Sequence, residues 1–483
     1  MSKYLDLSLV EINELLKKKE IKPIDLVEEA FERIEANKTL NCFITLNKEQ
    51  ALLKAKELEE KEADNLFFGI PIAVKDNIVT KDLRTTCASK ILENFLPIYD
   101  ACVVEKLKEN NMIIVGKTNM DEFAMGSTSQ TSYFGAPRNP WNLEKISGGS
   151  SGGSASCVAS RVVPFALGSD TGGSIRQPAS YCGIVGMKPT YGRISRYGLV
   201  AFASSLDQIG PMTRNVYENA CLLNILCGSD ERDLTSADKE KEDFTRLIGK
   251  DIIGMKIGVP NYFMTDIVDK EIRDKVQEVI KLLEEKGAIV ENIDIDYLEN
   301  AVTLYQIIAM GEASSNLARF DGIKYGYSIE DPKNVDDLYE RTRELGFGDE
   351  VKRRIMVGSY ILSGENATLY YNKALQIRDD MRKSFKNAFK EYDLIIGPTT
   401  TTVAYNLGEG LNDPSKSFMD DVLVFPVNMA GLPGINVPVG FNSEHMPIGL
   451  HIIGNSFEEA KIYQLASFVE KELVLDLDPR KEV

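Results

Sequence analysis

The chain has 483 residues, of which 43% are hydrophobic and 27% charged, and its formal net charge is −17. This composition is typical of a soluble globular protein with two or three average domains or one large α/β domain. The negative net charge argues against a chain that binds nucleic acid by itself, because an acidic surface repels phosphate backbones. We find neither a membrane-length apolar run nor a signal peptide.

Cysteine and histidine usage restricts the chemistry further. The seven cysteines are odd in number and include no CxxC pair, which favours reduced thiols in a cytosolic protein. Only two histidines are present, His445 and His451. With so few imidazoles, a Ser–His–Asp site is hard to build and a zinc site harder still, so we expect no metal site. Both histidines are expected to pack or to face solvent.

Helices and buried strands alternate along the chain. Apolar residues recur every three or four positions over 8–19 and 24–36, which predicts surface helices. Continuous apolar runs that end in polar residues predict strands covered on both faces. These strands are expected at 67–74, 111–116, 162–170, 255–260, 288–295, 391–400 and 431–440, with a helix at 268–286. Residues 138–146 are predicted to be irregular and the polar span 228–245 to be a surface connection.

This alternation predicts an α/β fold, namely an α/β/α sandwich whose central mixed, mostly parallel sheet is covered by helices on both faces. We expect a single domain over residues 1–483. Its parts are an N-terminal helical layer (1–65), a glycine-rich core (66–228), and the remaining strands and substrate-pocket helices (229–483), with extra helices around 299–390.

Two glycine–serine clusters, residues 147–156 and 168–180, stand out in the core. A flexible linker is disfavoured, because "CVASRVVPFAL" between the clusters predicts a helix followed by a buried strand. A phosphate-binding loop is also disfavoured: the nearest match, Gly116-Lys117-Thr118, has Asn111 where the first glycine is needed.

Three kinds of nucleophilic site remain. Residues 148–152 match GxSxG, but no buried strand precedes them as the nucleophile elbow of α/β hydrolases requires. The SxxK match at 236–239 lies in the charged connection and has no KTG partner. The third kind uses a lysine and two serines.

The core resembles the amidase signature family in "GIPIAVKDN", "GGSSGGSAS", "GSDTGGSIRQPAS" and "CGIVGMKPTYGRIS". The resemblance implies a triad of Lys75, Ser150 and Ser174 and a cis peptide between Gly149 and Ser150. It is compatible with the chemistry, because a serine hydroxyl needs its proton removed as it attacks, and a lysine at the end of a buried strand loses hydration and becomes a base. Backbone N–H groups are expected to form an oxyanion hole, from Thr171, Gly172, Gly173 and Ser174.

Outside the core, "GKTNMDEFAMGS", "EASSNLARFDGIKYG", "FGDEVKRRIMVGSY" and "DVLVFPVNMAGLPGINVP" resemble the glutaminase subunits of tRNA-dependent amidotransferases, over residues 5–470 or so. This resemblance implies that Tyr305, Arg354 and Asp421 hold free glutamine. A free amino acid is a zwitterion, so a guanidinium for its carboxylate and a carboxylate for its ammonium are the expected partners. Arg354 or Asp421 alone would more often be a surface charge, but both at matching positions favour a pocket.

Some positions depart from the family pattern. Ser147 replaces a proline, Gln306 a tyrosine and Met310 a proline, and "SGENATLYY" (363–371) is unusual after the arginine motif. None is a predicted catalytic or ligand-binding position, so the departures concern local backbone shape. The expected chemistry is unaffected.

The resemblance also implies partners. We expect a heterotrimer in the cytoplasm, or in an organellar matrix, whose B subunit uses ATP and Mg²⁺ to amidate Glu-tRNA(Gln) and whose small C subunit clamps this chain to the B subunit. This chain would bind no cofactor of its own and would contact tRNA only through the B subunit. One alternative is a free-standing amidase, which would lack the Arg354 and Asp421 pair. Another is an inactive scaffold, which would have lost a triad residue. The use of asparagine and of Asp-tRNA(Asn) is left open.

Overall fold

One large sheet organises the computed structural model, which describes residues 4–411 and 418–481. The sheet has 11 strands in the order β1-β3-β2-β6-β8-β7-β12-β13-β11-β9-β10. Their bounds are β1 Phe43–Leu46, β2 Pro71–Lys75, β3 Ile113–Thr118, β6 Phe165–Asp170, β7 Val185–Lys188, β8 Gln208–Thr213, β9 Lys256–Pro260, β10 Ile289–Ile293, β11 Leu394–Pro398, β12 Gly434–Phe441 and β13 Pro447–Gly454.

The sheet is mixed, but the expectation that it is mostly parallel is wrong. Within the described residues, parallel pairs occur only in two blocks, β3-β2-β6 and β11-β9-β10. Between and beside these blocks the pairs are antiparallel. Parallel strands were expected because the apolar runs are continuous. However, helices that cover both faces of a sheet impose the same apolar pattern on antiparallel strands.

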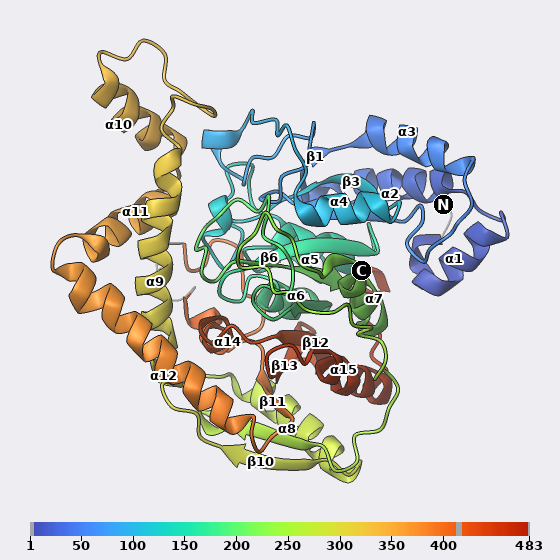
Figure 1. Cartoon of the computed structure of the whole chain (residues 1–483). Helices are drawn as coiled ribbons and strands as arrows, with labels where there is room; N and C mark the ends of the chain where they lie inside the picture. The colour runs from blue at the N-terminus through green and yellow to red at the C-terminus, as the bar shows by residue number, and fades with distance from the viewer. Residues whose placement is uncertain (1–3, 412–417, 482–483) are drawn as a thin grey trace.

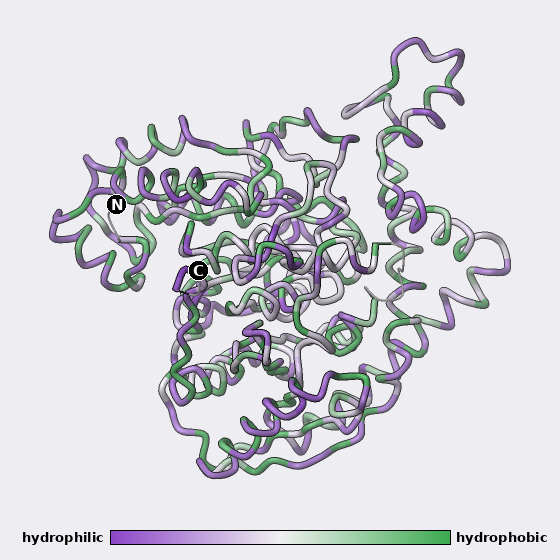
Figure 2. The backbone as a smooth tube through the Cα atoms, turned by 180° about the vertical axis from the view of Figure 1, so that it is seen from behind, coloured by the Kyte–Doolittle hydropathy of each residue, from purple (hydrophilic) through white to green (hydrophobic). Residues whose placement is uncertain are grey.

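Helices flank this sheet and add a separate layer. They are α1 Leu9–Lys17, α2 Pro23–Ala36, α3 Lys48–Glu59, α4 Cys102–Glu109, α5 Gly152–Ala159, α6 Arg176–Cys182, α7 Val216–Leu226, α8 Lys270–Glu285, α9 Ala301–Asn316, α10 Val335–Gly346, α11 Asp349–Leu362, α12 Lys373–Ala388, α14 Phe425–Ala430 and α15 Glu459–Leu473. Helix α7 packs on β8 and against α4 and α15, whereas α5 packs on β2 and β6 and against α6. The helices at the periphery alternate between hydrophilic and hydrophobic residues, as a helix with one buried face must (Figure 2).

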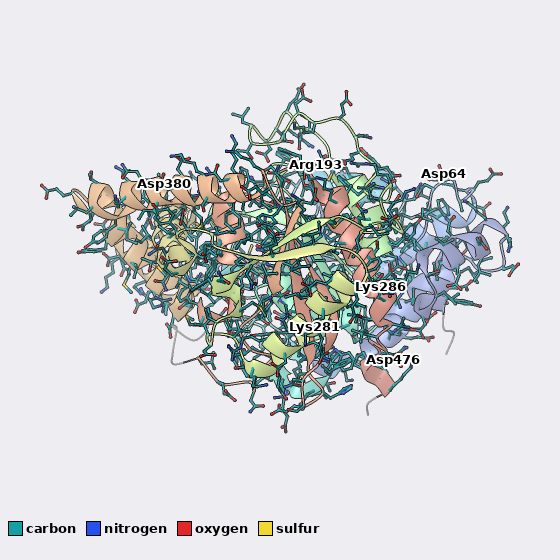
Figure 3. The ribbon with its side chains drawn as sticks, turned by 90° about the horizontal axis from the view of Figure 1, so that it is seen from below. Asp64, Arg193, Lys281, Lys286, Asp380 and Asp476 are labelled. Atoms are coloured by element: carbon teal, nitrogen blue, oxygen red, sulfur yellow. The ribbon has the colours of Figure 1, made fainter. Side chains whose placement is uncertain are left out.

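The predicted N-terminal and late helices are confirmed. Helix α1 begins with a capping box formed by Ser8 and Glu11, and α2 begins at Pro23. Helices α9, α11 and α12 form a layer beside the sheet, and α10 stands away from it (Figure 1). Seen from below, Asp380 of α12 and Asp64 of the N-terminal layer lie at opposite ends of the molecule (Figure 3).

Two further expectations can be compared with the structure. Residues 138–146 are not irregular: β4 (Arg138–Asn139) and β5 (Asn142–Ile146) form a small antiparallel sheet. The strands are short and mostly exposed, so they lack the apolar pattern that would have revealed them. The span 228–245 connects α7 to β9, as predicted. Among the described residues, no helix has both the length and the apolar character needed to cross a membrane.

Candidate active site

Lys75 is the last residue of β2 and is fully buried. Its Nζ lies 2.7 Å from Ser150 Oγ, 2.7 Å from Ser151 Oγ and 3.2 Å from the carbonyl oxygen of Ser169. The predicted lysine and the first of the two predicted serines are therefore in direct contact. The expected cis peptide between Gly149 and Ser150 is also present.

Burial changes the proton affinity of this lysine. Loss of hydration lowers the pKa of Lys75 from 10.5 to about 7, although the carboxylates of Asp121, Asp170 and Asp207 act to raise it. A substantial fraction of Lys75 is consequently neutral near pH 7. A neutral amine has two N–H donors and one lone pair, so it can serve as a base.

The hydrogen bonds around Lys75 show where that lone pair points. The carbonyl oxygen of Ser169 can only accept, and the Ser151 hydroxyl donates to this same oxygen at 3.1 Å, so Ser151 Oγ must accept from Lys75. The two N–H donors of neutral Lys75 are then used, and the lone pair faces Ser150. Ser151, which the sequence analysis did not single out, thereby orients Lys75 to take the Ser150 proton.

Ser174 lies in the turn between β6 and α6, and the residue is 5% exposed. In the part of the chain that the structure describes, its hydroxyl forms no hydrogen bond with Ser150. Catalytic hydrogen bonds often tighten only when substrate is bound. The Lys75–Ser150 half of the predicted triad is thus assembled, and the contact with Ser174 stays a prediction.

Asp170, at the end of β6, holds the backbone on both sides of Ser174. Its carboxylate accepts from the N–H of Gly173 at 2.8 Å and from the N–H of Ile175 at 3.1 Å. Arg176 donates to the two oxygens of this carboxylate from Nε and Nη2, each at 3.1 Å. The guanidinium of Arg176 holds the pKa of Asp170 far below its usual range despite complete burial.

This geometry corrects the predicted oxyanion hole. The Gly173 N–H is engaged with Asp170 and is not available to a substrate oxygen, so the predicted set loses one member. The N–H groups of Thr171, Gly172 and Ser174 donate to no other group within residues 4–411 and 418–481, and they remain the predicted donors.

Gln177 joins the two glycine–serine clusters. Its side-chain oxygen accepts from the N–H of Gly149 at 3.0 Å, and its own N–H donates to the carbonyl oxygen of Gly173 at 2.8 Å. Its side-chain amide also donates to the carbonyl oxygen of Ser127 at 2.8 Å. The loops that carry Ser150 and Ser174 are therefore fixed relative to each other.

Asp421 is buried beside the nucleophile loop. The Ser127 hydroxyl donates to Asp421 Oδ2, whereas Oδ1 is buried without a hydrogen-bond partner in the described part of the chain. A Cβ added to Gly173 would lie 2.7 Å from this Oδ1, so the carboxylate packs directly on the loop. Burial raises the pKa of Asp421 well above its usual range. An unpaired buried carboxyl group is a suitable acceptor for a substrate ammonium group.

Arg354 and Tyr305 complete the predicted pocket. Arg354 on α11 is buried, and its Nε donates to Glu350 Oε1 at 2.7 Å. Burial raises the pKa of Tyr305 on α9, and the charges of Arg354 and Asp421 both act on this phenol. Arg354 and Asp421 therefore both lie within electrostatic range of Tyr305, although the three residues are far apart in the sequence.

The two histidines differ in position. His445 is exposed and stacks on Phe441, as expected for a residue without a role. His451 is fully buried on β13, and its Nε2 lies 3.0 Å from Arg176 Nη1. Burial, and secondarily the Arg176 charge, lowers the pKa of His451 well below its usual value. The imidazole is thus neutral and accepts from Arg176.

No three or more His, Cys, Asp or Glu side chains are grouped to hold a metal ion in residues 4–411 and 418–481. The buried lysine at a strand end and the serine that it contacts are the groups expected of an amide-hydrolysing site. A family model described as Amidase matches residues 25–463. The chain belongs to the amidase family and is an enzyme of that class.

The chain was compared with individual relatives. The chain is 54% identical to the A subunit of the glutamyl-tRNA(Gln) amidotransferase of Pediococcus pentosaceus, over 97% of each chain. It is 53% identical to the corresponding subunit of Listeria innocua, again over 97% of each chain. The predicted resemblance to a subunit of tRNA-dependent amidotransferases is confirmed.

Solved structures are also similar to this chain. The same amidotransferase subunit from Thermotoga maritima is 41% identical and has a TM-score of 0.82, covering 98% of this chain and 96% of its own. A bacterial aryl acylamidase is 26% identical but has a TM-score of 0.85, covering 99% of this chain and 97% of its own. The fold is therefore shared by amidases with different substrates, and the pocket must decide the substrate.

Proposed function

We propose that this chain hydrolyses glutamine and supplies ammonia to a partner that converts Glu-tRNA(Gln) to Gln-tRNA(Gln). The observation that carries the choice of substrate is that Arg354 and Asp421 are both buried, each within electrostatic range of Tyr305. Arg354 holds the carboxylate of the substrate, and Asp421 Oδ1, which is unpaired in the described structure, accepts from its ammonium group.

The reaction then follows the proton path described above. Neutral Lys75 takes the proton of Ser150 as Ser150 takes the proton of Ser174, and Ser174 Oγ attacks the amide carbon. The oxygen becomes an oxyanion that accepts from the N–H groups of Thr171, Gly172 and Ser174. The C–N bond breaks as the proton returns through Ser150 to the nitrogen, releasing ammonia and leaving an acyl group on Ser174. Water hydrolyses this ester to glutamate.

The remaining parts of the reaction belong to partners. The B subunit would use ATP and Mg²⁺ to activate Glu on the tRNA, and a small C subunit would clamp this chain to the B subunit in a cytoplasmic heterotrimer. The net charge of −17 supports this division, because this chain offers little attraction to tRNA or ATP. An inactive scaffold is disfavoured because Lys75, Ser150 and Ser174 are all present.

The test is to purify the chain alone and together with its native partners and to measure glutamine hydrolysis by both. We expect the assembly to hydrolyse glutamine much faster, because an uncoupled glutaminase would waste its substrate. Equal turnover by the isolated chain would instead support the free-standing amidase. Inactivity of both preparations towards glutamine would refute the proposal.

A further inference from the structure

Asp207 is a buried carboxylate that the mechanism above does not use. It lies directly before β8, and its Oδ1 accepts from the Thr171 hydroxyl at 2.7 Å. Its Oδ2 accepts from the backbone N–H of Phe202 at 2.9 Å. Both oxygens are thus satisfied, and the Thr171 hydroxyl is committed to Asp207, so only the backbone N–H of Thr171 is available to a substrate.

Phe202, the other partner of Asp207, contacts the substrate pocket. Its ring lies 5.6 Å from the Arg354 guanidinium, in a cation–π arrangement. One carboxylate therefore joins the first predicted oxyanion donor, Thr171, to a residue that supports the predicted carboxylate ligand. Asp207 and Phe202 lie in the same turn of the chain, which Asp207 closes by donating its N–H to the carbonyl oxygen of Ala203 at 2.9 Å.

The segment 202–207 is itself fastened to the helical layer. Asn316 of α9 donates to the carbonyl oxygen of Phe202 at 3.1 Å, and Arg378 of α12 donates to the carbonyl oxygen of Ser205 at 2.9 Å. Glu312 of α9 accepts from the N–H of Ser205 at 2.9 Å. Asp207 is hence held by elements outside the sheet, and it transfers that fixed position to Thr171.

We propose that Asp207 is a positioning residue that sets the oxyanion loop at Thr171 and, through Phe202, the guanidinium of Arg354. This inference rests on the proposed function for the identity of the substrate, but the oxyanion contribution applies to any amide. Displacement of a catalytic group by about 1 Å can cost roughly 100-fold in rate.

The test compares variants of the chain assembled with its partners, on glutamine and on a simple neutral amide. Thr171→Val removes the hydroxyl and keeps the shape; we expect kcat to fall about 10- to 100-fold on both substrates with KM within about threefold. Thr171→Ser should restore kcat to within about threefold of the original. Thr171→Ala serves if the valine variant does not fold.

Asp207→Ala releases Phe202 as well as Thr171. We expect at least the same loss of kcat and, for glutamine alone, a rise of KM by about 3- to 10-fold, because Arg354 loses its support. Adding Thr171→Val to Asp207→Ala should cause no further loss, since both act through one hydrogen bond. As a matched control, Thr235→Val breaks an equivalent 2.7 Å Thr–Asp hydrogen bond, to Asp233 in the surface connection, and should leave kcat unchanged.

A Thr171→Val enzyme with normal kcat, or losses that multiply in the double variant, would overturn the inference. The proposed function fails separately, when the unaltered assembly hydrolyses the neutral amide but not glutamine. In that case the effect of Thr171→Val on neutral-amide turnover still tests the role of Asp207.

Discussion

Replacement of Lys75 tests the proton path most directly, because the structure sets the expected pH dependence. The pKa of Lys75 falls from 10.5 to about 7, which corresponds to about 5 kcal/mol in favour of the neutral amine. If neutral Lys75 is the base, kcat should be level above pH 8 and fall tenfold per unit below pH 7, to about 1% of the plateau at pH 5. Lys75→Arg should lower kcat about 10²- to 10⁴-fold, because arginine cannot deprotonate in this pH range, and Lys75→Ala should lower kcat by a similar factor.

The assay is ammonia release from glutamine by the assembled enzyme between pH 5 and 9 at saturating substrate. Lys188 offers a matched control, because it is also fully buried and burial lowers its pKa to about 7 as well. Lys188→Met should keep the acid limb and its midpoint, whatever its effect on the plateau. A level profile from pH 5.5 to 8, or near-normal turnover by Lys75→Arg, would refute the assignment of Lys75 as the base.

The same burial has a cost in stability. The unfolded chain binds a proton at Lys75 below pH 10.5, whereas the folded chain binds it only below about pH 7. Folding therefore loses stability as pH falls through that window, and at pH 7 nearly the whole penalty is present. Lys75→Met should remove it and raise the free energy of unfolding by about 1–4 kcal/mol while abolishing activity, as measured by urea denaturation. A destabilised methionine variant would contradict this account.

The remaining predictions concern the nucleophile, the pocket and the buried histidine. Ser174→Ala should abolish both the acyl-enzyme seen by mass spectrometry and hydrolysis, and Ser150→Ala should lower kcat about 10²- to 10⁴-fold; an acyl-enzyme in the first variant would assign the nucleophile elsewhere. Arg354→Ala and Asp421→Ala should each lower kcat/KM for glutamine by about 10²- to 10³-fold, since a buried charge left unpaired costs about 2–5 kcal/mol, and neutral amides should be unaffected. Equal losses on both substrates would make the two residues structural. The folded protein keeps His451 neutral, whereas the unfolded chain protonates it below about pH 6.5, so the free energy of unfolding decreases as the pH is lowered. His451→Gln should make the decrease between pH 8 and pH 5.5 smaller by about 1.4 kcal/mol. An unchanged acid dependence would exclude this group.

Much of the architecture could be predicted because strand ends and motifs are local. The run "FFGIPIAV" ends in a polar residue at Lys75, and the structure places β2 there. Other strands were not recognised. Strand β8 contains Gly210 and Pro211, and proline normally argues against a central strand, yet β8 lies between β6 and β7. Because β8 has no continuous apolar run, the sequence did not indicate a strand at this position.

The supports of the site could not be predicted for a different reason. His451 and Arg176 are 275 residues apart, and Asp207 and Thr171 are 36 apart. Neither His451 nor Asp207 carries a local signal of its contact. His451 is placed by the position of β13 in the sheet, and Asp207 by the contacts of the segment 202–207 with α9 and α12. The availability of an N–H group is equally invisible in a motif. The Gly173 N–H belongs to the glycine-rich turn, but only the position of Asp170 shows that it is already engaged.

The contacts between the pocket and the nucleophile loop explain how one fold can serve several amidases. A Cβ at Gly172 would lie 2.5 Å from Tyr305 Cε2, and Gly173, at φ +125°, is pressed against Asp421. The loop must therefore be bare where the pocket residues touch it. Lys75 ends strand β2 and the loop with Ser174 follows β6, whereas Tyr305 and Arg354 come from α9 and α11 of the added helical layer. The sheet can keep the same reacting groups while the ligand residues on this layer change, as long as α9 and α12 keep their contacts with the segment 202–207. This agrees with the near-equal structural similarity of the chain to an amidotransferase component and to an aryl acylamidase.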